Sequence, residues 1–143
     1  MATAADAELI LKLYDLRREP RMRQARRWVM HEFNPKNLDE LLAVQRDFGT
    51  DENQMWRQVI GYWEMAAALV LAGALDRVLF LESNGENLFI LAKFGRFNEE
   101  YARASGTNGF MPKMAALVSE YEPARKRVES LRAALEERQR KPK

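Results

Sequence analysis

Residues 61–76 read GYWEMAAALVLAGALD, so that Glu64 is followed by eleven residues without a polar side chain, Met65 to Leu75. Such a run inside a longer apolar-periodic segment predicts a helix that is buried at the centre of a fold. The run stops well short of the roughly 20 apolar residues that a membrane-spanning helix needs. We therefore expect a buried central helix that begins at Thr50 or Asp51 and carries one carboxylate.

Proline, glycine and asparagine residues divide the rest of the chain into further helices, and no strand-like alternation persists. We predict an all-α fold, a single-domain helical bundle of about seven helices around the central helix. The domain covers residues 1–143, with a frayed tail at 139–143. The predicted segments are 5–18, 20–33, 38–48, 51–72, a short helix after Asp76, 87–104, a helix from Pro112 and a helix that Pro123 either kinks or begins.

Capping residues indicate where several of these helices begin and end. Gly73 suits the left-handed position after the last turn of the central helix, because glycine has no Cβ atom to clash there. Asp76 is then placed to cap the short helix that follows. Ser83 and Glu86 have the Ser-x-x-Glu spacing of a capping box, which predicts that residues 87–104 form one helix.

The composition is typical of one folded domain. The chain has 143 residues, of which 47% are hydrophobic and 31% charged. It has no cysteine, which excludes disulfides, thiol catalysis and thiolate metal sites and fits a reducing compartment. The first residues lack the basic and apolar regions of a secretion signal. We expect a cytoplasmic protein without a membrane span.

Arginine residues gather near the start of the chain, although the net charge is only +2. Residues 37–100 are acidic, with eleven acidic and five basic residues. Guanidinium groups match phosphate oxygens and stack on bases. We favour a solvated helix face that pairs with the acidic middle, and the alternatives are nucleic acid, a protein partner and an anionic membrane surface. The candidate anion- or partner-binding residues are Arg17, Arg18, Arg21, Arg23, Arg26 and Arg27, opposed within the segment only by Glu19.

Glu64 is the sharpest candidate for a site inside the fold. A carboxylate on a helix that is apolar nearly all round must meet a cation or hydrogen-bond donors, or remain protonated. Arg57 lies seven residues earlier on the same helical face, and Arg26 and Arg27 come from another helix. We favour a structural ion pair and expect Glu64→Ala to destabilise the fold strongly. A pocket that combines Glu64 with Arg57 and Tyr62 is the alternative.

No metal, cofactor or catalytic signature accompanies these candidates. His31 is the only histidine, whereas zinc sites and di-metal helical sites require several histidine or cysteine ligands. Residues 106–109 lack the lysine and the spacing of a phosphate-binding loop and are typical of a turn. We therefore expect no metal and no cofactor.

The central helix and the turn after it carry a pattern of an aromatic pair, Glu, an apolar turn, Gly-x-Leu-Asp and an aromatic residue. The residues are Tyr62-Trp63-Glu64, Ala67, Leu69-Val70, Gly73, Leu75-Asp76 and Phe80. This pattern resembles an uncharacterised family of bacterial all-helical domains of unknown function, and it covers less than a fifth of the chain. The resemblance implies a compact helical domain in bacteria, and it implies no role for any residue.

Together these features predict a non-catalytic helical interaction or assembly module. We expect its partner to be a protein or a second copy of the chain. The apolar side chains of the central helix are expected to form an intramolecular core, and a homodimer seam or a ligand pocket between helices is the alternative. An arginine-mediated nucleic-acid-binding protein is the alternative. An enzyme or small-ligand binder with a pocket at Glu64 is the third possibility.

Overall fold

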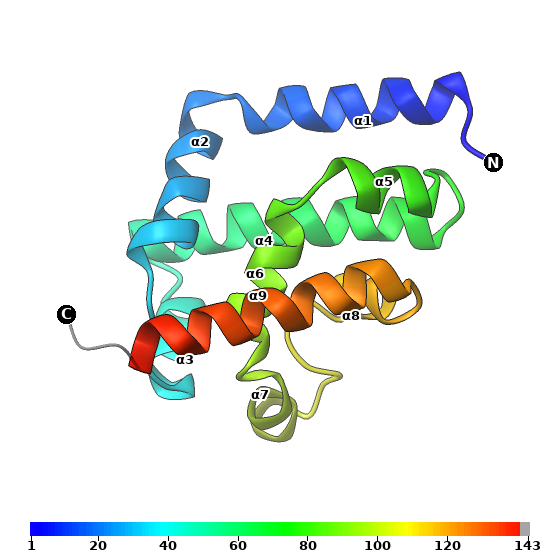
Figure 1. Cartoon of the computed structure of the whole chain (residues 1–143). Coiled ribbons are helices and arrows are strands. Elements are labelled where there is room, and N and C mark those ends of the chain that lie inside the picture. Colours follow the sequence, from blue (N-terminus) through cyan, green and yellow to red (C-terminus); the bar gives the residue numbers. More distant parts are fainter. Residues whose placement is uncertain (141–143) are drawn as a thin grey trace.

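The computed structural model describes residues 1–140, in which helices are joined by short connections and no β-strand is present (Figure 1). The prediction of an all-α fold is confirmed. The predicted count of about seven helices is too low for the described residues, because two of the predicted helices are divided. The segments are α1 (Ala4–Arg17), α2 (Pro20–Arg27), the π-helix η1 (Trp28–Glu32), α3 (Leu38–Arg46), α4 (Asp51–Leu71), α5 (Arg77–Ser83), α6 (Glu86–Gly95), α7 (Asn98–Ser105), α8 (Pro112–Ser119) and α9 (Glu122–Arg140).

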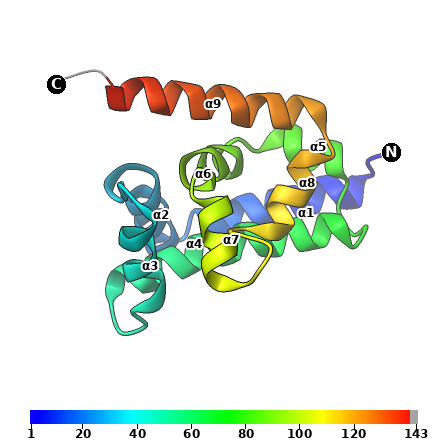
Figure 2. The same ribbon diagram turned by 90° about the horizontal axis from the view of Figure 1, so that it is seen from below.

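The helices are arranged around α4 and α6. In two perpendicular views α6 lies between α4 and α9, so that α9 covers the side of α6 that faces away from α4 (Figures 1 and 2). α9 packs against α6, while α8, α2 and α3 pack against α4. α1 runs along one edge and contacts α5 and α2. The surface has a hollow between α2 and α9 and another beside α4.

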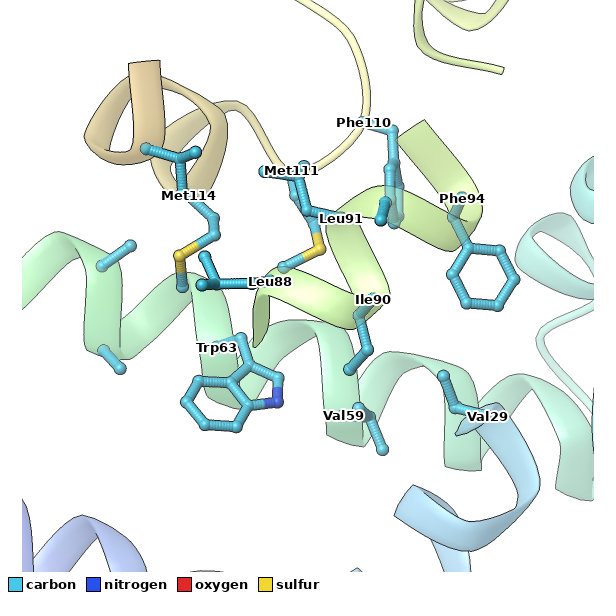
Figure 3. Packing of buried hydrophobic residues seen from close by; sticks show 14 of the residues in the cluster. Val29, Val59, Trp63, Leu88, Ile90, Leu91, Phe94, Phe110, Met111 and Met114 are labelled. Carbon is cyan, nitrogen blue, oxygen red and sulfur yellow. The ribbon is translucent and has the colours of Figure 1, made fainter. Parts of the chain in front are cut away.

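The core lies where α4 faces α6, and α8 closes it (Figure 3). Trp63 of α4, Ile90 of α6 and Met114 of α8 are almost completely buried. Burial of each large apolar side chain stabilises the fold by about 1.5–3 kcal/mol. The prediction of a buried central helix is confirmed for this side, but the helix is not covered all round, because Gly61 and Met65 on its other side are exposed.

The predicted ends of the central helix are confirmed. The Thr50 hydroxyl accepts a hydrogen bond from a backbone N–H in the first turn of α4 (3.1 Å). After α4, Gly73 has a φ of 84°, the left-handed conformation that a Cβ atom would strain. Leu75 is buried next to this turn. Asp76 caps α5 by accepting a hydrogen bond from the Leu79 N–H (2.9 Å).

The predicted capping box at Ser83 and Glu86 is not formed. Ser83 is the last residue of α5, and its hydroxyl donates to the Leu79 carbonyl (2.6 Å). The Glu86 carboxylate accepts hydrogen bonds from Arg26 instead (2.8 and 3.0 Å). Because both side chains are engaged elsewhere, α6 begins after Gly85 without a side-chain cap.

The prediction of one helix over residues 87–104 is also wrong. The chain breaks between α6 and α7, where the Phe97 N–H donates to the Phe94 carbonyl three residues earlier (3.1 Å). This tighter turn changes the direction of the chain and buries Phe97. Packing of this aromatic side chain therefore outweighs the local preference for a continuous helix.

The second predicted helix changes its hydrogen-bond register before it ends. α2 continues into η1, where the Phe33 N–H donates to the Trp28 carbonyl five residues earlier (2.8 Å). The wider turn leaves two carbonyls, those of Val29 and Met30, which accept hydrogen bonds from the Lys93 ammonium group (3.0 and 3.1 Å). A buried cation thus satisfies the C-terminal end of this helix and complements its dipole.

Two other helix ends differ from the prediction. α3 ends at Arg46 rather than at Phe48, and the Phe48 side chain is 66% exposed. Gln139 and Arg140 continue α9, so this part of the predicted frayed tail is helical, while residues 141–143 lie outside the described residues. No helix within residues 1–140 combines the length and the apolar character that crossing a membrane requires.

Candidate functional site

Glu64 caps a helix from another part of the chain. Its Oε1 accepts a hydrogen bond from the Lys113 N–H (3.1 Å) and its Oε2 from the Met114 N–H (3.0 Å), both in the first turn of α8. Met111 precedes α8 in a left-handed conformation, with φ of 52°, and its side chain makes no capping hydrogen bond. The carboxylate therefore satisfies two N–H groups that the helix leaves open, and its charge lies at the positive end of the helix dipole.

The ion pair that we favoured for Glu64 is not formed. The Arg57 guanidinium lies over the Phe48 ring, 5.0 Å from its centroid, and Arg26 binds Glu86. Of the three possibilities for a carboxylate on this helix, backbone hydrogen-bond donors are the one observed. The sequence could not reveal these donors because they come from a helix about 50 residues away.

Tyr62 points away from Glu64 and toward α1. Its hydroxyl donates to the Leu13 carbonyl (2.5 Å), and its ring meets Trp63 edge to face at 4.9 Å. Burial raises the pKa of the Tyr62 hydroxyl to about 12. The structure therefore brings Glu64 and Arg57 to one surface and places Tyr62 in the packing between α1 and α4.

We call this surface the glycine groove, a hollow of about 600 Å³ beside α4. Trp56 and Phe110 stack in its wall with centroids 5.5 Å apart, and the Gln45 amide donates to the Tyr101 hydroxyl (2.6 Å) across it. The groove thus combines aromatic and aliphatic side chains with several polar groups, and Trp56 and Phe110 are themselves almost completely buried. Its lining residues are Gln45, Arg46, Phe48, Trp56, Arg57, Ile60, Gly61, Glu64, Tyr101, Gly109, Phe110, Met111 and Pro112.

The six predicted arginines divide into two groups, and the first binds acidic side chains of the protein itself. Glu86 pairs with Arg26 (2.8 Å) and with Arg17 (3.7 Å), and Arg21 pairs with Asp51. Both acidic residues belong to the middle of the chain, so for these three arginines the predicted pairing with the acidic middle is confirmed.

The second group remains open to solvent. Arg18, Arg23 and Arg27 are exposed and form no ion pair within residues 1–140. Arg23 and Arg27 face a hollow that lies between α2 and α9, with the start of α6 beneath it. Only part of the arginine segment is therefore engaged in ion pairs within the fold.

We call this hollow the arginine groove. Its first part, about 760 Å³, adjoins a second part of about 610 Å³, and the two share Met30, His31 and Phe89. The lining of the first part is Arg23, Arg26, Arg27, Met30, His31, Gly85, Glu86, Phe89, Arg127 and Leu131. The second part adds Asn34, Lys93, Leu135, Arg138 and Gln139. Glu86, in the first part, is the one carboxylate among the residues that line the two parts, and it is already paired.

The wall formed by α9 was missed in the sequence. Arg127, Leu131, Leu135 and Arg138 are spaced 4, 4 and 3 residues apart, so they share one side of a helix. This spacing was available as a signal, and only its position opposite α2 required the structure. Within residues 1–140, no group of three or more histidine, aspartate or glutamate side chains is arranged to hold a metal ion.

The architecture is that of an all-α domain with two open grooves, one lined by arginines and one by aromatic side chains. The chain belongs to the family described as Domain of unknown function (DUF4760), which matches residues 2–121. The prediction of membership in an uncharacterised domain family is thereby confirmed. No curated protein and no solved structure matches the chain. The matched range contains the whole glycine groove and ends before α9 begins.

Proposed function

We propose that this domain is a non-catalytic interaction module that holds an acidic segment of a protein partner in the arginine groove. The observation that carries the proposal is the imbalance of charge along this groove. Arginines approach it from α2 and from α9, while its one carboxylate, Glu86, is neutralised by Arg17 and Arg26. The remaining positive charge favours an anionic occupant.

The open arginines supply the attraction. Arg23, Arg27 and Arg127 line the first part of the groove, and none of them forms an ion pair within residues 1–140. Guanidinium groups bind carboxylates with two parallel hydrogen bonds, which gives direction as well as strength. Because Arg23 and Arg27 belong to α2 and Arg127 belongs to α9, they lie on both sides of a segment bound in the groove.

The floor of the groove is apolar and favours a peptide over a purely charged polymer. Met30 and Phe89 lie in both parts of the groove, and Leu131 and Leu135 of α9 extend the apolar surface. All four are partly buried, so each has apolar surface that a partner could cover. An apolar floor with basic edges fits an amphipathic helix whose other face is acidic.

The length of the groove limits the size of the segment. Its α9 wall extends from Arg127 to Arg138, which is roughly 16 Å at the helical rise of about 1.5 Å per residue. A partner helix of about three turns would occupy this distance. The proposal therefore concerns a short segment of a partner rather than a large flat interface.

Nucleic acid is the second candidate, and the predominance of arginine over lysine in the lining favours it. Arg side chains bind phosphates and stack on bases. Single-stranded nucleic acid is usually held by several aromatic rings in succession. Phe89 and His31 are the only aromatic rings in the two linings, which supports the peptide as the first candidate.

Fluorescence anisotropy separates these candidates. The probes are a labelled helical peptide with leucines on one face and glutamates on the other, a scrambled peptide of the same composition, and random-sequence single-stranded RNA and DNA. We expect the amphipathic peptide to bind more tightly than its scrambled form, with an affinity that falls as salt rises. Tighter binding of RNA or DNA than of the peptide would favour the second candidate.

A matched pair of variants tests the position of the site. Replacing Arg23, Arg27 and Arg127 together by Gln should lower the affinity for the peptide by about tenfold or more. The control replaces Arg18, Arg125 and Arg140, three exposed arginines outside the groove, and makes the same change in net charge. Equal losses in the two variants would overturn the assignment of this groove, and no binding of any probe would overturn the proposed function.

Self-association stays a prediction. α1 exposes Leu11 (67%) and Tyr14 (52%) one helical turn apart, and Met65 of α4 is 46% exposed. Exposed apolar side chains of this kind are compatible with a homodimer seam. Sedimentation equilibrium over a range of protein concentrations, with Leu11→Glu as the variant, measures whether the chain associates through α1.

A further inference from the structure

The contacts around Gly61 do not explain why this position is a glycine. It lies in the middle of α4, where glycine is less favourable than alanine. A Cβ atom built at this position would meet no heavy atom within 4 Å, so neither a close neighbour nor a special backbone angle requires glycine. The residue is exposed and lines the glycine groove.

We propose that the glycine groove is a binding site for a small organic anion with an apolar ring or chain, and that Gly61 leaves the space into which the apolar part fits. An open backbone position is a common feature where a ligand must approach a helix closely. The site is separate from the arginine groove and shares no lining residue with it.

The wall of the groove suits the apolar part of such a ligand. Trp56 and Phe110 are stacked, and Ile60 and Tyr101 lie next to them in the lining. The volume of about 600 Å³ falls in the range of small-molecule sites, which are mostly apolar with a few placed polar groups. Trp56 and Phe110 are themselves almost completely buried, so an aromatic or aliphatic group would cover mainly the partly exposed Ile60 and Tyr101.

The polar groups at the edge select an anion. Arg46 and Arg57 line the groove and form no ion pair within residues 1–140. The Arg57 guanidinium is held over the Phe48 ring, which fixes the direction of its side chain. The Tyr101 hydroxyl accepts a hydrogen bond from Gln45, so its own proton is available to a ligand.

Glu64 does not oppose an anion as strongly as its charge suggests. Both of its oxygens accept hydrogen bonds from backbone N–H groups at the start of α8. These donors and the helix dipole offset the negative charge locally. The two arginines consequently determine the sign of the ligand, and the aromatic wall determines its apolar character.

The probe for this site is 1-anilinonaphthalene-8-sulfonate, an aromatic anion whose fluorescence rises in apolar surroundings. We expect saturable binding with one site per chain. Gly61→Leu should weaken the binding by about tenfold or more, because its Cβ atom meets no neighbour within 4 Å and the rest of the side chain extends into the open space of the groove. Gln58→Leu, an exposed position of the same helix outside the groove, is the matched control and should bind as the wild type does.

The charge requirement is tested separately. Arg46→Gln and Arg57→Gln should each weaken binding of the sulfonate several-fold and reduce its salt dependence. The uncharged parent dye N-phenyl-1-naphthylamine should bind more weakly, and these two variants should not change its binding. Absence of binding, unchanged binding in Gly61→Leu, or a loss that follows the arginines of α2 and α9 instead would each overturn the proposal.

Discussion

The arginine groove draws its cationic walls from α2 and α9, which are about 100 residues apart in sequence, whereas the glycine groove lies beside α4 and combines aromatic, aliphatic and polar side chains. Each groove contains one carboxylate, Glu86 in the first and Glu64 in the second. The fold engages both, Glu86 with two arginines and Glu64 with two backbone N–H groups. The comparison teaches that structural pairing of the carboxylate leaves the other arginines of each groove without an ion-pair partner within residues 1–140.

Replacing Glu86 is expected to have the largest effect on stability. Its side chain is 10% exposed, and Glu86→Gln removes the charge that Arg17 and Arg26 share. Breaking a buried pair leaves an uncompensated charge, so we expect a loss of about 3 kcal/mol in the free energy of unfolding. Urea denaturation with an unchanged m-value measures this loss.

The same variant should act in the opposite direction on binding. With Glu86 neutral, Arg17 and Arg26 add to the positive charge of the arginine groove, and affinity for the acidic peptide should rise several-fold. Binding to the glycine groove should stay the same, because the two grooves share no residue. A variant that is as stable as the wild type would show that the carboxylate does not hold the two arginines.

Glu64→Ala should cost about 2 kcal/mol, because two backbone N–H groups lose a charged acceptor. Glu64→Gln retains one acceptor and should cost about half as much. Hydrogen exchange at the amides of Lys113 and Met114 should accelerate in both variants. Glu129→Ala, an exposed position on α9, is the control. Unchanged exchange at the start of α8 would show that Glu64 does not cap this helix in solution.

The features predicted correctly depend on residues that are close together in the chain. The central helix, its Thr50 start, the left-handed Gly73 and the Asp76 cap follow from local backbone requirements. The errors at Ser83 and at the α6–α7 break arise from contacts that outweigh local preference. Local chemistry therefore determines most helix ends in this domain, and packing determines where a helix must bend.

The candidate sites were predicted less completely, since each depends on a residue from far along the chain. The arginines of α2 were identified, but the acidic partners that distinguish the paired arginines from the open ones are distant in the sequence, Asp51 at 30 residues from Arg21 and Glu86 at 60 residues from Arg26. The acceptor role of Glu64 depends on α8, and the second wall of the arginine groove depends on α9. No spacing within the arginine segment could have revealed which of its side chains would remain exposed.

Lys93, which lines the second part of the arginine groove, should have a smaller effect on stability, and this effect should vary with pH. Burial, with a further contribution from Arg96, lowers the pKa of Lys93 from 10.5 to about 8. Between these two values the unfolded chain binds more protons than the folded chain, so the contribution of this group to stability rises as pH rises from 8 toward 10.5. The rise should be absent in Lys93→Met and present in the control Lys12→Met, as measured by urea denaturation at pH values up to about 9.5. Identical pH profiles for all three proteins would show that Lys93 is not buried as described.

Gly61→Ala should have the smallest effect, and it has the opposite sign. Alanine is favoured over glycine in a helix interior by about 0.5–1 kcal/mol, and the added Cβ meets no neighbour, so thermal unfolding should shift upward. Gly95→Ala is the contrasting variant, because a Cβ there would lie 2.6 Å from the Arg132 guanidinium and would displace it. If Gly61→Ala stabilises the protein and weakens binding of the sulfonate, the glycine serves the groove at the expense of the helix. If Gly61→Ala destabilises the protein, Gly61 is required by the fold rather than by the glycine groove. The two grooves would then no longer differ in that the glycine groove depends on the absence of a side chain and the arginine groove on ion pairing.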